Sequence, residues 1–396
     1  MAGVVGRLPG HRRLPVAVLP AVAVLAAAAA VAVPAVRHSD AATTVSVVAG
    51  SAPPALPADP LPTALRARWS APPAMPSAMT SAATPVRAAA AEGGTVVVAD
   101  RTGLAGRDPV TGAPRWSYHR GNAELCGWTV RDGVVVALFG KAQRCTDLTA
   151  LDLGTGARRW YRNADLGREV DLTGAAGVVV ARSGDQLLAV DTATGLNRWT
   201  ARKPGCRYGP VAVGTLGAVA VLSCGSRIQV VSHDPYADSQ RWSVPAPGAD
   251  PLVLAVGEQR VAVLAGGRDR TLTLYDGSGH RLGTVTDSRL AGPAAPGWPT
   301  GIEDAGLLLW TGRLVVAVDP GAATVRWAAR ADGPPALDGG QVLFAVPGGF
   351  VECSLRTGRV LRRVTTEGGA PHRGARLARI GRLLVAASPD GTTVLG

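Results

Sequence analysis

Five cysteines are the residues whose spacing points most directly to chemistry. Cys126 and Cys145 lie 19 residues apart, and Cys206 and Cys224 lie 18 residues apart. In each pair the first cysteine precedes a Val-rich segment and the second lies at its end or just beyond, so an antiparallel strand pair would bring the two sulfurs together. We predict disulfides Cys126–Cys145 and Cys206–Cys224, each stabilising by about 3 kcal/mol through loop closure, with Cys353 as a buried free thiol. The alternative is five unpaired cysteines in the core.

Motifs of enzymatic or metal chemistry are missing from the sequence. It contains no Gly-x-x-x-x-Gly-Lys-Ser/Thr phosphate loop, no His-Glu-x-x-His zinc helix and no Gly-x-Ser-x-Gly nucleophile elbow. The six histidines are scattered without metal-ligand spacing, and the adjacent Glu303 and Asp304 are more typical of a solvated loop than of a catalytic pair. We therefore predict no catalytic, cofactor-binding or metal-ligating residues, no cofactor and no enzymatic activity.

The charge of the chain is strongly basic, with a formal net charge of +12. Lys141 and Lys203 are its two lysines, so nearly all of the positive charge is arginine, and no block of five like charges occurs. Arginine and aromatic residues are interleaved at 158–162 (RRWYR), but that Trp belongs to a repeat described below. We therefore expect no nucleic-acid partner; a basic surface near anionic lipid headgroups or an acidic envelope polymer is the better interpretation.

The N-terminal region predicts a membrane anchor. Residues 14–36 (LPVAVLPAVAVLAAAAAVAVPAV) form an uncharged stretch that would rise roughly 35 Å as a helix, enough to cross a hydrocarbon core of about 30 Å. More arginine precedes than follows this stretch, which places residues 1–13 in the cytoplasm and the rest of the chain outside. A cleaved signal peptide is the alternative, although its apolar region is usually shorter.

Residues 37–64 are rich in Ala, Pro, Ser and Thr and have little periodicity. Such a segment buries little apolar surface, so we expect a tether that holds the folded part away from the bilayer.

The rest of the chain repeats with a period near 42 residues. Five nine-residue peptides open with Asp and end with Trp: Asp108 to Trp116, Asp152 to Trp160, Asp191 to Trp199, Asp234 to Trp242 and Asp319 to Trp327. Two degraded copies occupy 276–284 and 354–362. Short apolar strands precede these peptides, and turn residues separate the strands. A unit of several strands at this period predicts a β-propeller blade, in which one large Trp per repeat fills the gap between neighbouring blades.

Eight Val- and Leu-rich strands are countable, which predicts eight blades: TVVVAD, GVVVALF, GVVVAR, GAVAVLS, RVAVLAG, GLLLWTG, GQVLFAV and RLLVAAS. The last unit reaches residue 396 where its Asp-to-Trp peptide is due. Arg68, Trp69 and Ser70 repeat the Arg-Trp-Ser of two other copies. We therefore expect residues 65–71 to supply the outer strand of the last blade, beside 392–396, within a propeller spanning 65–396. Seven blades are the alternative, if the unit near 354 is not a true blade.

These repeats resemble the pyrroloquinoline-quinone-like repeat family, whose unit ends in Asp-x-x-Thr-Gly-x-x-x-Trp. The closest copies are LLAVDTATGLNRW and LTALDLGTGARRW. The resemblance implies an eight-bladed all-β propeller, as in quinoprotein dehydrogenases and in BamB-type propellers that assist outer-membrane protein assembly. The dehydrogenases hold their quinone against a disulfide between adjacent cysteines and also use calcium and an aspartate base. This chain has no adjacent cysteines.

We therefore expect a membrane-anchored extracytoplasmic propeller that binds envelope proteins or anionic polymers as a scaffold or accessory factor. The alternatives are a quinone-dependent oxidoreductase and a propeller that binds a glycan or small ligand in its central channel. Binding of the quinone with calcium would distinguish the oxidoreductase from the scaffold.

Overall fold

The computed structural model describes residues 40–54, 56–57, 59–72, 89–167, 169–175, 177–267, 269–292, 300–303, 306–338, 340–367, 373–388 and 390–396. The predicted cytoplasmic segment 1–13 and membrane span 14–36 lie outside these residues. No helix of the described part is long and apolar enough to cross a membrane. The chain divides into two compact units, Met1–Thr44 and Val45–Gly396, and of the first only α2 (Asp40–Thr43) and Thr44 are described.

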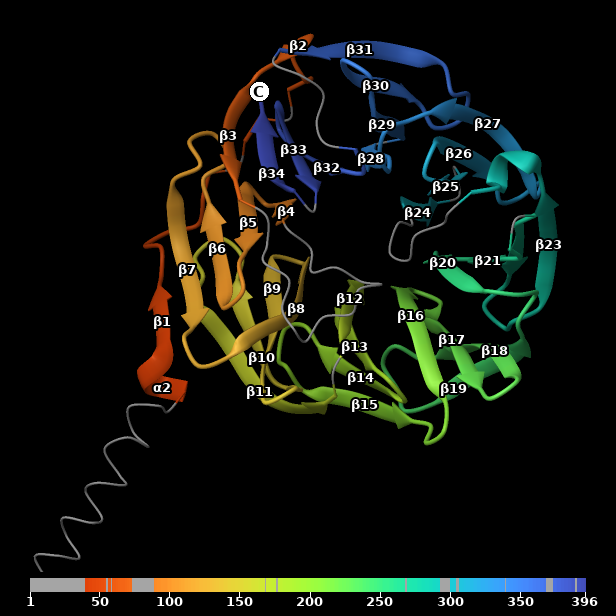
Figure 1. Ribbon diagram of the computed structural model, residues 1–396, viewed down its shortest axis with the longest axis horizontal. Helices are drawn as coiled ribbons and strands as arrows, with labels where there is room; N and C mark the ends of the chain where they lie inside the picture. The colour runs from red at the N-terminus through yellow and green to blue at the C-terminus, as the bar shows by residue number, and fades with distance from the viewer. Residues whose placement is uncertain are drawn as a thin grey trace, which may run out of the picture. The chain divides into compact units, whose positions relative to one another are not determined.

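The second unit is a ring of eight β-sheets around a centre, as Figure 1 shows. Blades 1 and 2 consist of β4 (Ala89–Glu92), β5 (Thr95–Ala99), β6 (Gly103–Arg107), β7 (Pro114–Arg120), and of β8 (Glu124–Arg131), β9 (Val134–Lys141), β10 (Arg144–Asp152), β11 (Arg158–Leu166). Blades 3 and 4 consist of β12 (Asp171–Ala175), β13 (Val178–Ser183), β14 (Gln186–Asp191), β15 (Asn197–Arg202), and of β16 (Arg207–Gly214), β17 (Gly217–Cys224), β18 (Arg227–His233), β19 (Gln240–Pro245).

The other half of the ring follows the same plan. Blades 5 and 6 consist of β20 (Leu252–Val256), β21 (Val261–Ala265), β22 (Thr271–Tyr275), β23 (Arg281–Thr286), and of β24 (Thr300–Glu303), β25 (Gly306–Trp310), β26 (Leu314–Asp319), β27 (Thr324–Arg330), with η1 (Ser288–Leu290) between them. Blades 7 and 8 consist of β28 (Ala336–Asp338), β29 (Gln341–Val346), β30 (Gly349–Ser354), β31 (Val360–Thr366), and of β32 (Arg376–Ile380), β33 (Leu383–Ser388), β34 (Gly391–Leu395), β3 (Ala67–Ala71). The eight-bladed prediction is confirmed, because the unit near 354 is a complete blade.

The second and third strands of each blade are buried on both faces, which explains why they read as apolar runs rather than as alternating patterns. In β9 the side chains from Val134 to Phe139 are all buried. The core therefore lies between neighbouring sheets: Leu138 and Leu148 of blade 2 share one apolar cluster with Val179 and Leu188 of blade 3. No blade could bury these faces alone, so the ring folds only as a set of neighbours.

The ring closes through the N-terminal side of the propeller, as predicted. β3 pairs antiparallel with β34, with Trp69 opposite Val394 and Ser70 opposite Thr393. The Ser70 and Thr393 hydroxyl oxygens lie 3.1 Å apart, within hydrogen-bond distance. The last blade thus combines strands from both ends of the chain, which ties first to last and covers the edge of β34.

The segment predicted as a tether differs from that expectation over residues 45–64, which pack along the propeller. β1 (Thr44–Val47) adds a fifth strand outside β7 in blade 1, and β2 (Ala64–Leu65) pairs in parallel with β31 in blade 7. Leu61 is only 2% exposed. The composition did not reveal this because the segment is held by hydrogen bonds to backbone carbonyl groups and by a few scattered apolar side chains such as Leu61, which form no periodic pattern.

Between these two strands, the described residues of 49–61 (49–54, 56–57 and 59–61) run over four blades, and we call this segment the belt. The Ala49 amide donates to the Thr155 carbonyl of blade 2 at 2.9 Å. The carbonyls of residues 51, 59 and 61 accept hydrogen bonds from arginines of blades 1, 8 and 7, namely Arg115, Arg379 and Arg362. The belt therefore bridges the point of ring closure from both sides.

Candidate binding faces and the repeat turns

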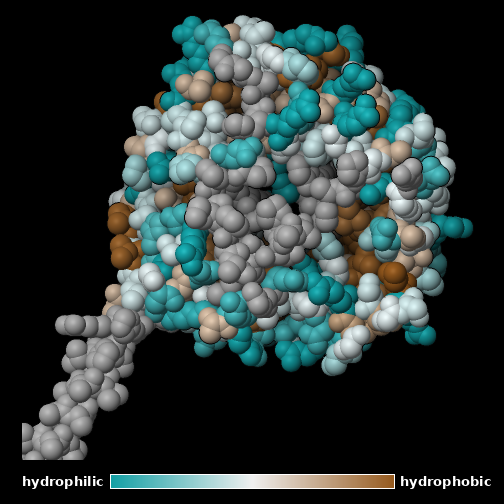
Figure 2. All heavy atoms as spheres, viewed as in Figure 1, coloured by the Kyte–Doolittle hydropathy of each residue, from teal (hydrophilic) through white to brown (hydrophobic). Residues whose placement is uncertain are grey.

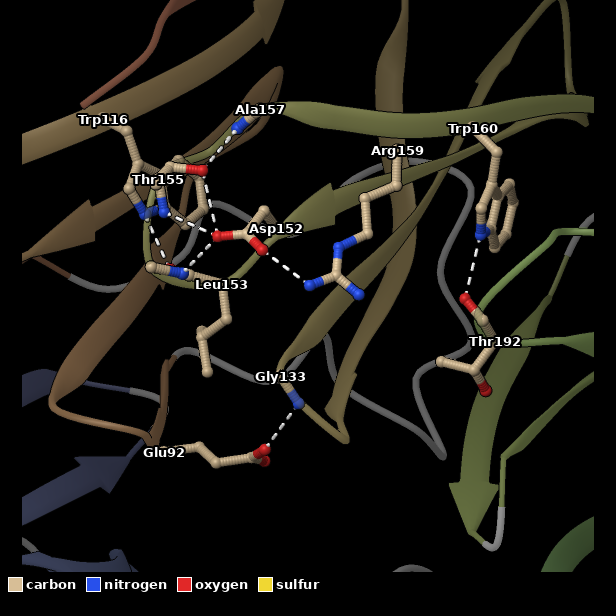
Figure 3. Close-up of polar contacts among 11 residues, drawn as sticks. Glu92, Trp116, Gly133, Asp152, Leu153, Thr155, Ala157, Arg159, Trp160 and Thr192 are labelled. Carbon is tan, nitrogen blue, oxygen red and sulfur yellow. Dashed lines mark hydrogen bonds and ion pairs between the residues drawn. The ribbon is translucent and has the colours of Figure 1, made fainter. Parts of the chain in front are cut away.

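The repeated Asp builds a turn. In blade 2 the Asp152 Oδ1 accepts from the amides of Gly154 and Thr155 at 3.0 and 2.9 Å and from the Thr155 hydroxyl at 2.9 Å (Figure 3). Its Oδ2 accepts from the Arg159 guanidinium at 2.6 Å. Burial opposes ionisation of Asp152, but the hydrogen bonds from Arg159 and Thr155 outweigh it, and the pKa is lowered. This carboxylate is therefore occupied by its own turn.

The other four complete copies repeat this arrangement. Each Asp accepts hydrogen bonds from turn amides and has a lowered pKa: Asp108, Asp191, Asp234 and Asp319. In three of them the arginine seven residues later pairs with the same carboxylate: Arg198, Arg241 and Arg326. These acids are structural groups.

The repeated Trp joins each blade to the next. Trp116 Nε1 donates to the Leu153 carbonyl at 2.9 Å, and Trp160 Nε1 donates to the Thr192 carbonyl at 2.9 Å (Figure 3). Both acceptors lie in the Asp-led turn of the following blade. The glycine of that turn has a positive φ: a Cβ added to Gly156, with φ +73°, would lie 2.6 Å from Trp116 Cγ. Gly therefore serves both the left-handed backbone and the close approach of the ring.

Trp69 and Trp327 make the same contacts with the blades that follow them. The junctions that follow blades 3 and 5 are among those that depart from the pattern. Trp199 faces a turn in which Asp238 stands where Gly is usual, and its ring stacks on His233 with centroids 5.3 Å apart. Gly283 occupies the Trp position of blade 5, and a Cβ there would lie 3.0 Å from the Ala323 Cβ. The degraded copy at 276–284 thus replaces a large-small pair by two small residues.

Both predicted disulfides are present, Cys126–Cys145 in blade 2 and Cys206–Cys224 in blade 4. The first is buried, and the second is partly exposed. Cys353 is a buried free thiol, and burial, together with the neighbouring Glu352 carboxylate, raises its pKa to about 11.

The antiparallel blades give the ring two loop-bearing faces. One carries the Asp-led turns and the belt, and we call it the repeat-turn face. The other carries the turns between second and third strands, the connections between blades and both disulfides, and we call it the cysteine face.

The cysteine face holds a polar pocket of about 540 Å³ between blades 2 and 3. Its lining includes two arginines and two aspartates, with serine, glutamine and glycine: Arg144, Asp165, Gly167, Ser183, Gly184, Asp185, Gln186 and Arg202. Arg144 forms an ion pair with Asp165, and Arg202 donates to the Gln186 side-chain oxygen at 2.6 Å. The charges balance, so the pocket suits a polar segment that carries donors and acceptors rather than a polyanion.

A buried charge network joins blade 1 to blade 2. Arg120, only 1% exposed, pairs with Asp147 at 2.7 Å, and its guanidinium lies 5.6 Å from the Phe139 ring centroid. The Tyr161 hydroxyl donates to the other Asp147 oxygen at 2.8 Å. Both carboxylate oxygens of Asp147 are thus occupied, one by Arg120 of blade 1 and one by Tyr161 of blade 2, which helps to hold the two blades together.

Comparison with known proteins agrees with this repeat geometry. Residues 63–201 match the family model described as outer membrane protein assembly factor BamB. This part of the chain, less than half of it, is therefore similar to the pyrroloquinoline-quinone-like repeat of BamB. The two disulfides are typical of an oxidising, extracytoplasmic compartment. No curated protein shows significant sequence similarity to the chain.

Solved structures share the propeller fold. The computationally designed Ika8 protein is 14% identical with a TM-score of 0.56, covering 83% of this chain and 98% of its own. The quinohemoprotein alcohol dehydrogenase from Comamonas testosteroni is 12% identical with a TM-score of 0.50, covering 84% and 76%. BamB from Moraxella catarrhalis is 17% identical with a TM-score of 0.49, covering 78% and 95%. At these identities the likeness concerns the fold alone.

The centre of the ring contains charges that the sequence could not have assigned to it. Arg376 lies on the innermost strand of blade 8 and Asp171 on that of blade 3. Burial lowers the pKa of Arg376, and the Asp171 carboxylate opposes this shift. Burial also lowers the pKa of Arg182, again opposed by Asp171. The charge of Asp171 thus acts on two arginines from distant parts of the chain.

The cysteines and acidic residues of this chain do not fit a quinone held as in the dehydrogenases of the repeat family. Each disulfide joins cysteines separated by 18 or 19 residues, whereas the quinone is held against a disulfide of adjacent cysteines. Among the residues that the structure describes, no three His, Cys, Asp or Glu side chains gather in a way that could hold a metal ion. Of the predicted loop pair, Glu303 ends β24 and Asp304 lies outside the described residues.

Proposed function

We propose that this protein is a membrane-anchored extracytoplasmic propeller that acts as a binding scaffold in the cell envelope, through its cysteine face, without catalysis. The anchor is the apolar segment 14–36. The partner is an envelope protein or polymer that offers both hydrogen-bond donors and acceptors. The observation that carries the proposal is the charge-balanced pocket between blades 2 and 3.

The use of the repeated residues supports a binding role for the loops. Asp152 and its counterparts are occupied by their own turns, and Trp116 and its counterparts lie between blades. The side chains that stand out most in the sequence are therefore committed to the scaffold. Function is left to loop residues that vary between blades, as is usual for rigid scaffolds.

The cysteine face is the better candidate for the binding surface, because the belt covers part of the opposite face. The belt lies over the repeat-turn face of blades 1, 2, 7 and 8, so a partner there would compete with an intramolecular segment. On the cysteine face, the Cys126–Cys145 bridge lies beside Arg144 of the pocket, and Cys206–Cys224 follows the strand end that carries Arg202. Loops held by disulfides lose less entropy on binding.

Charge reversal in the pocket tests this function. The full chain is expressed in intact cells, crosslinked and recovered as Asp185→Lys, Arg202→Glu or the unsubstituted protein. Glu258→Lys, an exposed turn residue of the repeat-turn face, is the matched control. We expect one set of adducts with the unsubstituted and control chains and its loss from both pocket variants, since unpaired charges at an interface are costly.

Two results would count against the proposal. One is an adduct pattern that both pocket variants leave unchanged. The other is stoichiometric binding of pyrroloquinoline quinone in the presence of calcium, with dye-linked dehydrogenase activity, which would make the protein an enzyme.

A further inference from the structure

The strand β1 exposes an uncharged apolar strip at the rim of blade 1. Val45, Val47 and Val48 are 60%, 55% and 51% exposed, and we call them the valine strip. Residues 44–52 (TVSVVAGSA) include no charged side chain. Figure 2 shows apolar residues at the rim where Figure 1 places β1. Exposed apolar side chains that cluster without charged neighbours are typical of interaction sites.

The position of β1 in its sheet adds to this exposure. β1 is the outermost strand of blade 1, and among the described strands none pairs with its outer edge. The outer strands of blades 2 and 3 carry charge instead: β11 carries Arg158 and Arg162, and β15 carries Arg198 and Arg202. Charged side chains discourage unwanted contacts at a sheet edge. Blade 1 has instead an apolar edge, which points to an occupant that accepts valine.

The length of chain before β1 identifies that occupant. Residues 37–43 alone connect the predicted membrane span 14–36 to β1, and even fully extended they reach at most about 30 Å. From residue 49 onward the belt is hydrogen-bonded to the blades. The valine strip is therefore the part of the described propeller that connectivity keeps nearest to the bilayer.

We propose that the valine strip lies in the interfacial layer of the membrane that residues 14–36 cross, so that blade 1 rests against the bilayer. The inference rests on the anchoring included in the proposed function. Three valines would bind lipid weakly on their own, but a covalent anchor makes the contact intramolecular and raises its effective concentration. The ring would then be held to the membrane at blade 1, instead of being free to rotate on its linker.

Depth-dependent quenching tests this placement. The full chain is reconstituted into vesicles of phosphatidylethanolamine and phosphatidylglycerol, with a nitrobenzoxadiazole label at Val47→Cys. Cys353 is buried and the other cysteines are bridged, so the label is selective. Leu282→Cys, 52% exposed on β23 across the ring (Figure 1), is the matched control. We expect lipids with a headgroup nitroxide to quench the label at position 47, with a blue-shifted emission, and not at 282.

Two further variants separate lipid contact from mere proximity. Adding Val45→Ser and Val48→Ser to the labelled chain should remove most of the quenching at position 47. Inserting about 20 Gly/Ser residues between 37 and 40 lengthens the linker. The quenching should remain, because the valine strip itself contacts the membrane.

Three results would each overturn the inference. They are equal quenching at positions 47 and 282, loss of quenching with the longer linker, and energy transfer between labelled copies without lipid quenching. These outcomes are distinct from failure of the proposed function. Membrane retention of the chain and adduct formation at the pocket are measured independently and can hold while the valine strip faces water.

Discussion

Substituting Gly156 by Ala isolates the contact that joins blade 1 to blade 2. Gly156 has φ +73°, and the new Cβ would lie 2.6 Å from Trp116 Cγ, a ring that is 1% exposed and cannot move outward. An L-residue in the left-handed region costs roughly 1–2 kcal/mol, and overpacking a filled site adds about 1–3 kcal/mol. Gly133→Ala is the matched control, because it has φ +71° in the same blade and nothing within 4 Å of its Cβ.

The two variants share the backbone penalty, so their difference reports the Trp contact alone. We expect Gly156→Ala to be less stable than Gly133→Ala by about 1–3 kcal/mol, measured as the difference in free energy of unfolding in denaturant. In a Trp116→Leu background this difference should shrink, since a smaller, flexible side chain can yield to the methyl group. Equal stability of the two alanine variants would refute the close Trp–Gly contact as the unit that joins blades.

Three more predictions concern the disulfides, the His119–Asp100 pair and the closure of the ring. Mild reduction of the folded protein should open Cys206–Cys224 before the buried bridge of blade 2, which thiol alkylation and mass mapping would show; the reverse order contradicts the exposures. The His119–Asp100 pair raises the pKa of His119 from 6.5 and lowers that of Asp100 from 3.8 to about 2, so His119→Gln should lose less than about 1 kcal/mol, mainly between about pH 4 and 6.5. That loss fades above the raised His119 pKa, where the ring is neutral in both states, and fades again as the pH falls from about 4 toward 2, the pKa of Asp100 in the folded protein; a loss independent of pH would contradict it. Deleting 60–72 removes β2 and β3 and should lower the melting temperature of the whole ring; unchanged thermal unfolding would contradict closure through this segment.

The sequence predicts the ring well because its main determinants are local and repeated. An Asp-led turn needs only its own amides and a nearby arginine, as at Asp152, so each copy leaves a readable trace. Closure could be predicted from Trp69 because the fragment Arg-Trp-Ser lacks a preceding strand of its own. The cysteine spacing gave both bridges because each closes within one blade.

Features that depend on distant parts of the chain could not be predicted. The belt is held by its carbonyl groups, which every residue possesses, and by scattered apolar side chains such as Leu61, so residues 49–61 show no distinctive pattern. The pocket joins Asp165 at the end of one blade to Asp185 and Arg202 of the next, and Asp171 influences the pKa of Arg376, which lies far along the chain. Such groupings follow from how blades pack around the ring, and no spacing in the sequence encodes them.

A photoreactive amino acid at residue 185 tests the central claim most directly. The full chain would be expressed in intact cells and irradiated, with a second chain carrying the same group at residue 258 on the repeat-turn face. Binding through the cysteine face predicts a discrete adduct with an envelope component at 185 that is missing at 258. Adducts of equal yield at both positions, or adducts at 185 with cytoplasmic proteins alone, would contradict it.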